Sequence, residues 1–515
     1  MKRQILAIVL AGLASASMAF AAGGGTLRIA TDRQPRNLNP VFADDSASAE
    51  IISYVFDPLL RTNEKGEYEP VLAASLPDIS KDGKTITFKL RKGIKWHDGV
   101  ELTAEDVKFS LELILKKETN SPNIGYMDVI EKIEIIDPYT FRFRLADVES
   151  QIMRDFSSEW IVPKHILSKM TKDEMEKGDY SRLPIGNGSF KIAENRTNER
   201  IVLVTNNSYY GKAPKLDGMV SLITPSGTTA LLKVETGEAD IAACPAGDRA
   251  RMKGNPKLEL YEYPSTAFDF LQYNLKTPFF GDKRVRQAFA HAVNIDAIIK
   301  GIYKGGCVPA ATSFTLPGFW FANPKVKPYT YDVELSRKLL DEAGWKTGPD
   351  GIRAKDGKRF EIDILTNQGD TSREKLVVYL QTALKAIGVE VHPKIVEWNT
   401  LFDDYVDAGK FDAFVSGFSG SRYPVNNYYK TGHYLNAGKY SNPHLDKLMK
   451  GIRETFDQKK QRDLSFEIQQ ILSDEQPYTW FVFKSQADAV SKNVKGAKYL
   501  PYRGAYEMYM WSVAK

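Results

Sequence analysis

The sequence holds only two cysteines, Cys244 and Cys307, in 515 residues. Two cysteines are too few for a disulfide-rich scaffold, and they form no CxxC pair that would suggest a zinc site. Whether they join in a single bridge in an oxidising compartment stays open at this level. Histidine is also scarce, and no two histidines have the spacing that pairs metal ligands on one helix face, so we expect no cofactor: His97, His165, His291, His392, His433 and His444.

A strong excess of charge is missing too. The chain has 70 Lys and Arg against 65 Asp and Glu, a formal net charge of +5. Removal of an N-terminal leader that contains Lys2 and Arg3 lowers this to +3. A surplus this small, spread along the chain, provides no electrostatic surface for nucleic acid. We therefore expect no nucleic-acid partner.

Common catalytic signatures are absent. The sequence has no P-loop, no G-x-S-x-G elbow, no HExxH and no EF-hand spacing. Gly186-Asn187-Gly188 lacks the third glycine and preceding strand of a dinucleotide site, and is typical of a turn. Asp403-Asp404 lies on an expected helix, where neighbouring side chains face different ways. His97-Asp98 could form a catalytic couple, but a turn that closes a hairpin is the simpler interpretation. We expect that the chain is not an enzyme.

The longest apolar run lies at the N-terminus. After a short basic start, residues 5–19 are almost entirely apolar, and Ala19-Phe20-Ala21 has the small-x-small pattern of a signal-peptidase site. The run is short for a membrane span of about 20 residues, and no basic cluster follows it. No cysteine lies near the cut, which argues against a lipoprotein. We expect a signal peptide at 1–21, cleavage near Ala21 or Ala22, and a periplasmic protein that does not span the membrane.

The rest of the chain has the pattern of an α/β protein. About 490 residues remain after the leader, more than one core normally serves, so two or three packed units are expected. Two expected helices end at Gly344 and Gly388, where a left-handed cap is needed. Hydrophobic periodicity predicts strands at 26–30, 84–90, 129–136, 140–145, 190–194, 200–205, 360–365 and 389–396, and helices at 104–116, 283–302, 332–343 and 371–387.

Residues 69–113 carry the most specific pattern, with LAASLP, DGKTITFKLRKGIKWHDG and LTAEDVKFS in this order. This segment closely resembles the signature of the extracellular family 5 solute-binding proteins, the dipeptide, oligopeptide and nickel-type receptors of ABC importers. Most of the other matches are turns, caps and packing positions, which identify a fold rather than a ligand. They follow in family order at 186–190, 207–217, 232–241, 273–274, 282–288, 339–345, 411–413 and 440–448.

The resemblance implies an α/β, two-lobed periplasmic binding protein (type II, cluster C-like) with a hinge and an inserted subdomain. A small-molecule ligand would bind between the lobes, and hinge closure would present the complex to an inner-membrane ABC permease. We expect a monomer. The implied boundaries are a discontinuous lobe I at 22–55, 183–274 and 487–515, an inserted subdomain at 56–182, and lobe II at 275–486.

The resemblance places the main ligand contacts between Trp398 and Tyr429. Trp398 matches a position where family members place an aromatic ring on the ligand, and Gly417-Phe418 matches the family's Gly-Trp. Peptide receptors then carry an aspartate for the peptide α-amino group, whereas this chain has Ser421 beside Arg422 and no acid before Tyr429. The expected ligand-binding residues are Arg33, Gln34, Trp398, Gly417, Phe418, Ser419, Ser421, Arg422 and Tyr423.

The missing acid changes the expected ligand. A buried ammonium group without a counter-charge is strongly disfavoured, so the site should select against peptides with a free amino terminus. Arg422 suits a carboxylate, a phosphate or a hydroxyl-rich compound instead. The leading prediction is therefore a receptor for a small polar organic ligand, such as an oligosaccharide, an opine-like compound or another acid.

Other interpretations stay open. A di- or oligopeptide receptor could take its acid from Asp44 or Asp45. A metal-chelate receptor would need His433 at the cleft, and a secreted hydrolase would need a centre at His97 or Ser421. A chaperone-like or signalling receptor could reuse the same fold, because fold does not determine function.

We predict that the exported protein begins at Ala22 or within a few residues of it, because the small-x-small pattern ends at Ala21. N-terminal sequencing of periplasmic material checks this. Membrane-bound protein that retains Met1 would contradict it.

Overall fold

The computed structural model describes residues 24–514 except 317, 420–422, 425–426 and 503. The predicted leader, Ser421 and Arg422 therefore lie outside the described residues. Within the described part, no helix has both the length and the apolar character needed to cross a membrane.

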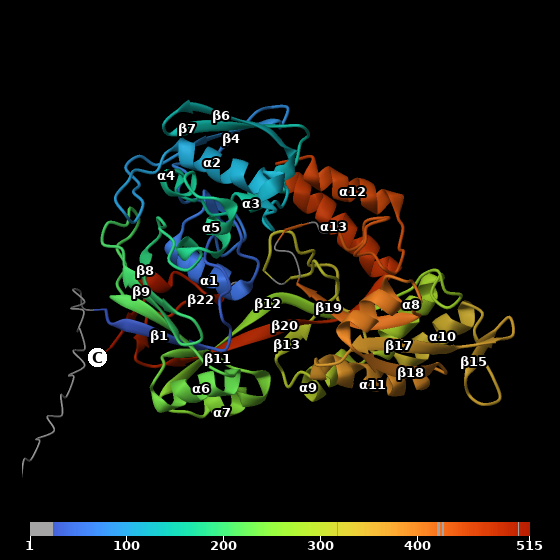
Figure 1. The fold of residues 1–515 in the computed structure, drawn as a ribbon. Helices are drawn as coiled ribbons and strands as arrows, with labels where there is room; N and C mark the ends of the chain where they lie inside the picture. The colour runs from blue at the N-terminus through green and yellow to red at the C-terminus, as the bar shows by residue number, and fades with distance from the viewer. Residues whose placement is uncertain (1–23, 317, 420–422, 425–426, 503, 515) are drawn as a thin grey trace, which may run out of the picture.

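One eleven-stranded sheet runs through the described part of the molecule (Figure 1). Its order is β18-β17-β19-β12-β20-β11-β1-β10-β9-β8, and β13 also pairs with β20. We call the part around β1 and β8–β11 lobe I, and the part around β17–β19 lobe II. The strands are β1 (Thr26–Thr31), β8 (Phe190–Arg196), β9 (Arg200–Thr205), β10 (Gly218–Ile223), β11 (Ile241–Ala243), β12 (Leu258–Tyr273), β13 (Cys307–Pro309), β17 (Glu361–Asn367), β18 (Glu390–Val396), β19 (Ala413–Ser419) and β20 (Tyr478–Ser491).

Two long strands, β12 and β20, join the lobes. They are antiparallel neighbours, and β20 pairs with β11 in lobe I while β12 pairs with β19 in lobe II. Their register shifts at the crossing point, because Pro264 lies opposite Ser485 but Phe268 lies opposite Phe483. The two additional residues on β12 interrupt the ladder, and such a bulge bends a strand pair locally. The two-lobed α/β architecture expected from the sequence is therefore present.

A separate four-stranded sheet, in the order β4-β5-β7-β6, forms the subdomain that we call the insert. Its helix α2 (Ala104–Leu115) begins with a capping box in which the Asp106 carboxylate accepts from the Thr103 amide at 2.9 Å. The insert and lobe I share one continuous apolar core. The strands are β4 (Asp78–Ile79), β5 (Thr85–Lys89), β6 (Ile130–Asp137) and β7 (Thr140–Leu145).

Lobe II has an apolar core on each face of its sheet. Helices α8, α10 and α11 cover one face, and α12 and α13 cover the other (Figure 1). Figure 1 also shows α12 of lobe II beside the insert. The helices are α8 (Lys283–Ala292), α10 (Val333–Glu342), α11 (Thr371–Lys385), α12 (Pro443–Arg453) and α13 (Gln458–Glu475).

Most elements predicted from periodicity are confirmed to within two residues at each end. Gly344 and Gly388 take the left-handed conformation expected of them, with φ of 88° and 81°. The single helix predicted at 283–302 is wrong, since α8 stops at Ala292 and a second helix, α9 (Ile295–Gly301), follows. The Asn294 side chain accepts from the Ala297 amide and starts that new helix.

Both cysteines are buried and free, so the described structure contains no bridge between Cys244 and Cys307. Gly186 and Gly188 lie against the backbone of α1 (Ser46–Val55), where a Cβ at either position would collide with it. Close packing therefore explains these two glycines. The interpretation of this segment as a turn is wrong, because residues 184–187 form no turn and only Gly188 and Ser189 bend before β8.

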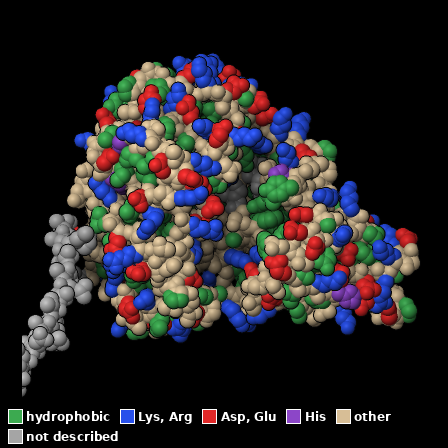
Figure 2. Space-filling model, viewed as in Figure 1, with side chains coloured by type: hydrophobic (Ala, Val, Ile, Leu, Met, Phe, Trp, Pro, Cys, Tyr) green, Lys and Arg blue, Asp and Glu red, His purple; other side chains and the backbone are tan. Residues whose placement is uncertain are grey.

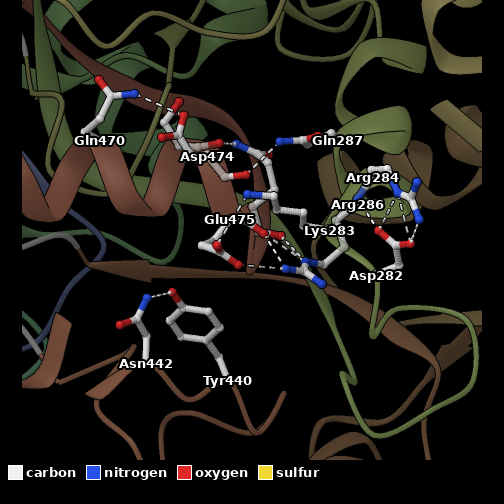
Figure 3. Close-up of polar contacts among 12 residues, drawn as sticks. Asp282, Lys283, Arg284, Arg286, Gln287, Tyr440, Asn442, Gln470, Asp474 and Glu475 are labelled. Atoms are coloured by element: carbon white, nitrogen blue, oxygen red, sulfur yellow. Dashed lines mark hydrogen bonds and ion pairs between the residues drawn. The ribbon is translucent and has the colours of Figure 1, made fainter. Parts of the chain in front are cut away.

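The matched segment at 282–288 forms the start of α8 (Figure 3). The Asp282 side chain caps the helix by accepting from the Arg284 amide. Arg286 is only 2% exposed and donates to the carbonyls of Glu475, at 2.6 Å, and of Phe280, also at 2.6 Å. This motif fastens α8 to the end of α13, just before β20, and so has a structural role.

We predict that Arg286→Met lowers the free energy of unfolding by about 3 kcal/mol or more, because several buried carbonyls lose their donor. Arg284→Met on the same helix removes a guanidinium that is 43% exposed, and should lower the free energy of unfolding much less than Arg286→Met. Urea unfolding of both variants checks this. Equal losses would contradict the assigned role.

Candidate functional site

A hollow lies between the two lobes (Figure 2). We call the predicted ligand-contact segment from Trp398 to Tyr429 the strip, and its residues Gly417–Ser419 lie on β19, which pairs with the crossing strand β12. Gly417 lies opposite Asp269, and Ser419 lies opposite Ala267, next to the register shift of β12. This part of the strip therefore lies where lobe II meets the hinge strands.

Phe418 belongs to an aromatic layer at this end of β19. Its ring stacks on Tyr428 at 4.3 Å between centroids and lies 4.8 Å from the Phe270 ring. The Tyr428 hydroxyl donates to the Ser419 carbonyl at 2.8 Å. Phe418 and Ser419 are thus held by the strand and by a tyrosine from the following loop.

Trp398 lies just after β18, with 47% of its surface exposed and its ring 4.6 Å from that of Phe402. A core position would be buried, so the indole is available at the surface of lobe II. Neighbouring Asp403 and Asp404 belong to a π-helical turn, Thr400–Val406, in agreement with the expected helix.

The two predicted lobe I residues have different surroundings. Arg33 donates to the Glu50 carboxylate at 3.2 Å and is exposed. Gln34 accepts from the Asn198 amide at 2.8 Å and donates to the Pro35 carbonyl at 2.9 Å. The Gln34 amide is therefore already occupied by backbone groups of lobe I, whereas Arg33 keeps donors that face solvent.

Tyr423 reaches the opposite side of the hollow. Its ring stacks on Tyr68 of β3 (Tyr68–Pro70) with centroids 6.5 Å apart, and its hydroxyl lies 3.3 Å from Ser157 Oγ. The Arg154 guanidinium lies 5.7 Å from the centre of the same ring. Tyr423 thus connects the predicted strip to the insert.

A buried ionic network beneath the strip was not anticipated from the sequence. Asp269, with no exposed surface, accepts from the Tyr303 hydroxyl at 2.6 Å and pairs with Lys484 at 3.0 Å and Arg373 at 3.2 Å. Asp370 also contacts both cations. An aspartate inside the apolar run Phe268-Asp269-Phe270 was the one signal for it.

The network holds the hinge strands because it joins β12 and β20 to α11 and to Tyr303, which follows the end of α9. Burial alone would raise the pKa of Asp370, but Lys484 and Arg373 outweigh it and keep that pKa below its ordinary value. A Cβ at Gly417 would collide with Asp269 and Arg373, which explains the glycine at this position of the strip. Its two acids and two bases balance, so it provides no excess charge for a ligand.

A second contact joins the lobes away from the strip. Arg453 at the end of α12 donates to the buried Glu149 carboxylate of the insert at 2.6 Å. The adjacent Ser150 amide donates to the Arg453 carbonyl at 2.7 Å. The Arg453 guanidinium also lies 5.5 Å from the centre of the Tyr126 ring. This interlobe contact closes one side of the hollow.

The proposed catalytic couple of His97 and Asp98 is not formed. His97 Nε2 lies 3.1 Å from the Gly188 carbonyl, and Nδ1 accepts from the Gly186 amide at 3.2 Å. Burial lowers the pKa of His97 to about 4, in keeping with a neutral ring. Asp98 pairs with His165 instead, at 2.7 Å. These groups bind neighbouring structure, as the turn interpretation predicts.

Comparison with known proteins identifies the family that has this architecture. The family description "Bacterial extracellular solute-binding proteins, family 5 Middle" matches residues 67–440, more than half of the chain. The chain belongs to family 5 of the bacterial extracellular solute-binding proteins. It is a solute-binding protein of an ABC transporter rather than an enzyme, and its partners are a ligand and a membrane permease.

Individual relatives cover nearly the whole chain. The oligopeptide-binding protein AppA of Bacillus subtilis is 31% identical over 96% of this chain and 92% of its own. The dipeptide-binding protein of Escherichia coli is 28% identical, over 94% of each. The structure of NikZ from Campylobacter jejuni in complex with Ni(L-His) has a TM-score of 0.74 and 25% identity, over 95% of this chain and 99% of its own.

We predict that Arg453→Met moves the lobes apart. The substitution leaves the buried Glu149 carboxylate unpaired, which should destabilise the contact by about 2–5 kcal/mol. Small-angle scattering should show a larger radius of gyration than for the native chain. Glu149→Gln combined with Arg453→Met removes both charges and should restore part of the compactness.

The matched control is Arg462→Met on α13, whose guanidinium is 41% exposed and pairs with its neighbour Asp463. Its scattering profile should be unchanged. A profile for Arg453→Met that overlays the native one would show that the Glu149 contact does not hold the lobes.

Proposed function

We propose that this chain captures a small polar organic ligand between its lobes by hinge closure and delivers it to the inner-membrane permease of an ABC importer. The observation that supports closure is the pair β12 and β20, which crosses between the lobes with a shifted register at Pro264–Phe268. A bend at one bulge allows both lobes to stay rigid while the angle between them changes. We propose further that the exported, periplasmic protein acts as a monomer, because one chain supplies both walls of the hollow.

We also propose the domain boundaries that follow from the resemblance. Residues 22–55, 183–274 and 487–515 make lobe I, 56–182 the inserted subdomain, and 275–486 lobe II. The apolar cores support this division, since the insert shares its core with lobe I while the two cores of lobe II lie mainly between Phe268 and Phe483.

The ligand class is proposed from the strip and from the relatives together. The relatives are described as binding oligopeptides, dipeptides and a nickel–histidine complex, so amino-acid-derived compounds are the natural range to test. Within that range we keep the prediction that a free peptide amino terminus is disfavoured, because the strip has Ser421 where peptide receptors have an acid. The proposed ligand-contact residues remain Arg33, Gln34, Trp398, Gly417, Phe418, Ser419, Ser421, Arg422 and Tyr423.

The alternative source of an acid finds little support. The Asp45 carboxylate accepts from the Ser48 amide at 2.8 Å and from its hydroxyl at 2.6 Å, and so caps α1. Asp44 lies 4.0 Å from Arg36, with both side chains well exposed. Asp45 is therefore occupied as a helix cap and Asp44 is solvent-exposed, so neither position favours the binding of a peptide ammonium group.

We predict that a bound ligand makes the particle more compact in small-angle scattering and is recovered unchanged. Ordinary di- and tripeptides should bind weakly in calorimetry. For a ligand with a carboxylate or phosphate in a desolvated cleft, Arg422→Ala should weaken binding by about 2–5 kcal/mol. Against a neutral polyol the loss should be nearer about 1–3 kcal/mol.

Two results would contradict this proposal in different ways. Sub-micromolar binding of unmodified peptides, unaffected by Arg422→Ala, would show that the strip has been misassigned. A ligand recovered hydrolysed, with repeated turnover, would contradict binding without chemistry.

A further inference from the structure

The insert wall that faces lobe II contains a short turn after α3 (Ile152–Asp155). The Glu159 amide donates to the Asp155 carbonyl at 2.7 Å and closes this turn. Ser157 and Arg154 of the same turn contact Tyr423, the strip residue that reaches across from lobe II. Glu159 therefore belongs to the part of the wall that lies against the predicted strip.

Glu159 differs from the other acids of this wall. Its carboxylate is partly buried, and it has no hydrogen bond or ion pair with any residue that the structure describes. Asp155 accepts from the Tyr126 amide and lies 3.9 Å from Arg154, and Glu149 holds Arg453. Only Glu159 among these three carboxylates is left without a partner.

The neighbouring cations are already engaged. Arg154 lies over two aromatic rings, Tyr126 and Tyr423, each 5.7 Å from the guanidinium carbon. Arg453 is held by Glu149 at the interlobe contact. Burial, with the like charge of Asp155, raises the pKa of Glu159 to about 8. A ligand that brings a cation to such a carboxylate stabilises its ionised form, and the new ion pair adds to the binding free energy.

We infer that Glu159 is a specificity-determining residue that binds a cationic group of the ligand, a primary ammonium or a guanidinium, from the insert wall. This inference rests on the proposed function, because it needs a ligand enclosed between the lobes. Tyr68 and Tyr423 lie beside the same turn, and aromatic faces add to the attraction for a cation.

The inference also refines the ligand class. In peptide receptors of the family the acid is part of the strip, whereas here the acid lies on the facing wall. A ligand would therefore carry its cation at the end that meets the insert, and its acidic or hydroxyl-rich part near the strip. A basic side chain meets that requirement, whereas the α-amino group of an ordinary peptide does not.

The probes are N-acetylated tripeptides that differ only in one residue: lysine, arginine or the neutral isostere norleucine. The full mature chain is compared with Glu159→Gln and with Glu131→Gln, which removes an exposed glutamate from β6 of the same subdomain. We expect the native chain to prefer lysine over norleucine by at least about tenfold, since a buried charge-assisted bond is worth more than one factor of ten. Glu159→Gln should abolish this preference, and Glu131→Gln should retain it.

A second measurement uses proton linkage. Below pH 8 the free acid is largely protonated, and binding of an ammonium group requires the carboxylate, so a proton is released. The lysine probe should therefore bind about tenfold or more tightly at pH 8 than at pH 6 in the native chain, and with little change in Glu159→Gln. The other charged or titratable groups around this turn are Arg154, Asp155, Tyr68, Tyr126 and Tyr423.

The outcomes separate the two proposals. Equal binding of the lysine and norleucine probes, or a lysine preference that survives in Glu159→Gln, overturns the role of Glu159 and leaves the receptor function intact. If the native chain binds no probe, retains no ligand in native mass spectrometry and never becomes more compact, the proposed function fails, and the inference with it. Circular dichroism confirms that each variant is folded, and proton release in the native chain tests the role without any substitution.

Discussion

The pairing of β12 with β20 is the constraint on which the rest of this structure depends. These neighbouring strands cross between the lobes and carry a bulge at Ser265–Ala267, where the ladder loses its regular register. On the lobe II side of the bulge, Asp269 of β12 pairs with Lys484 of β20 and with Arg373 of α11, and it accepts from Tyr303, which follows α9. A second register shift lies between Asp269 and Phe270, so the irregular pairing is confined to residues 264–270 of β12. A short irregular stretch between regular ladders is the place where bending between two lobes concentrates.

The position of the strip follows from the same strands. β19 extends the sheet from β12, so Gly417 and Phe418 lie at the end of lobe II that is nearest the hinge. The collision that any Cβ at Gly417 would make with Asp269 and Arg373 links the strip to the ionic network directly. A ligand bound there touches the strand that is fixed to the hinge, and through Tyr423 it also approaches the insert.

Two carboxylates of the insert, Glu149 and Glu159, differ in whether the protein itself supplies a partner. The Glu149–Arg453 pair is complete within the protein, and it stabilises an arrangement of the lobes without using a ligand. Glu159 is incomplete, because its partly buried carboxylate forms no hydrogen bond or ion pair with a described residue, and the charge of Arg154 acts on it only from a distance. A complete pair shifts the balance between open and closed forms, whereas an incomplete one makes closure depend on what the ligand carries.

The sequence by itself determined the class of this protein and most of its helices and strands. The periodic segments at 104–116 and 371–387 carry their own caps, Thr103 and Gly388, so local chemistry was enough to predict them. Local chemistry failed at residues 293–294, where Asn294 caps a second helix within an apolar pattern that continues unbroken. Only the tertiary structure decided which charges meet: Asp269 lies far in sequence from Arg373 and Lys484, and Glu149 far from Arg453. Whether a carboxylate such as Glu159 has a partner depends on the packing of distant segments, because burial and charge neighbours are properties of the folded chain rather than of its local sequence.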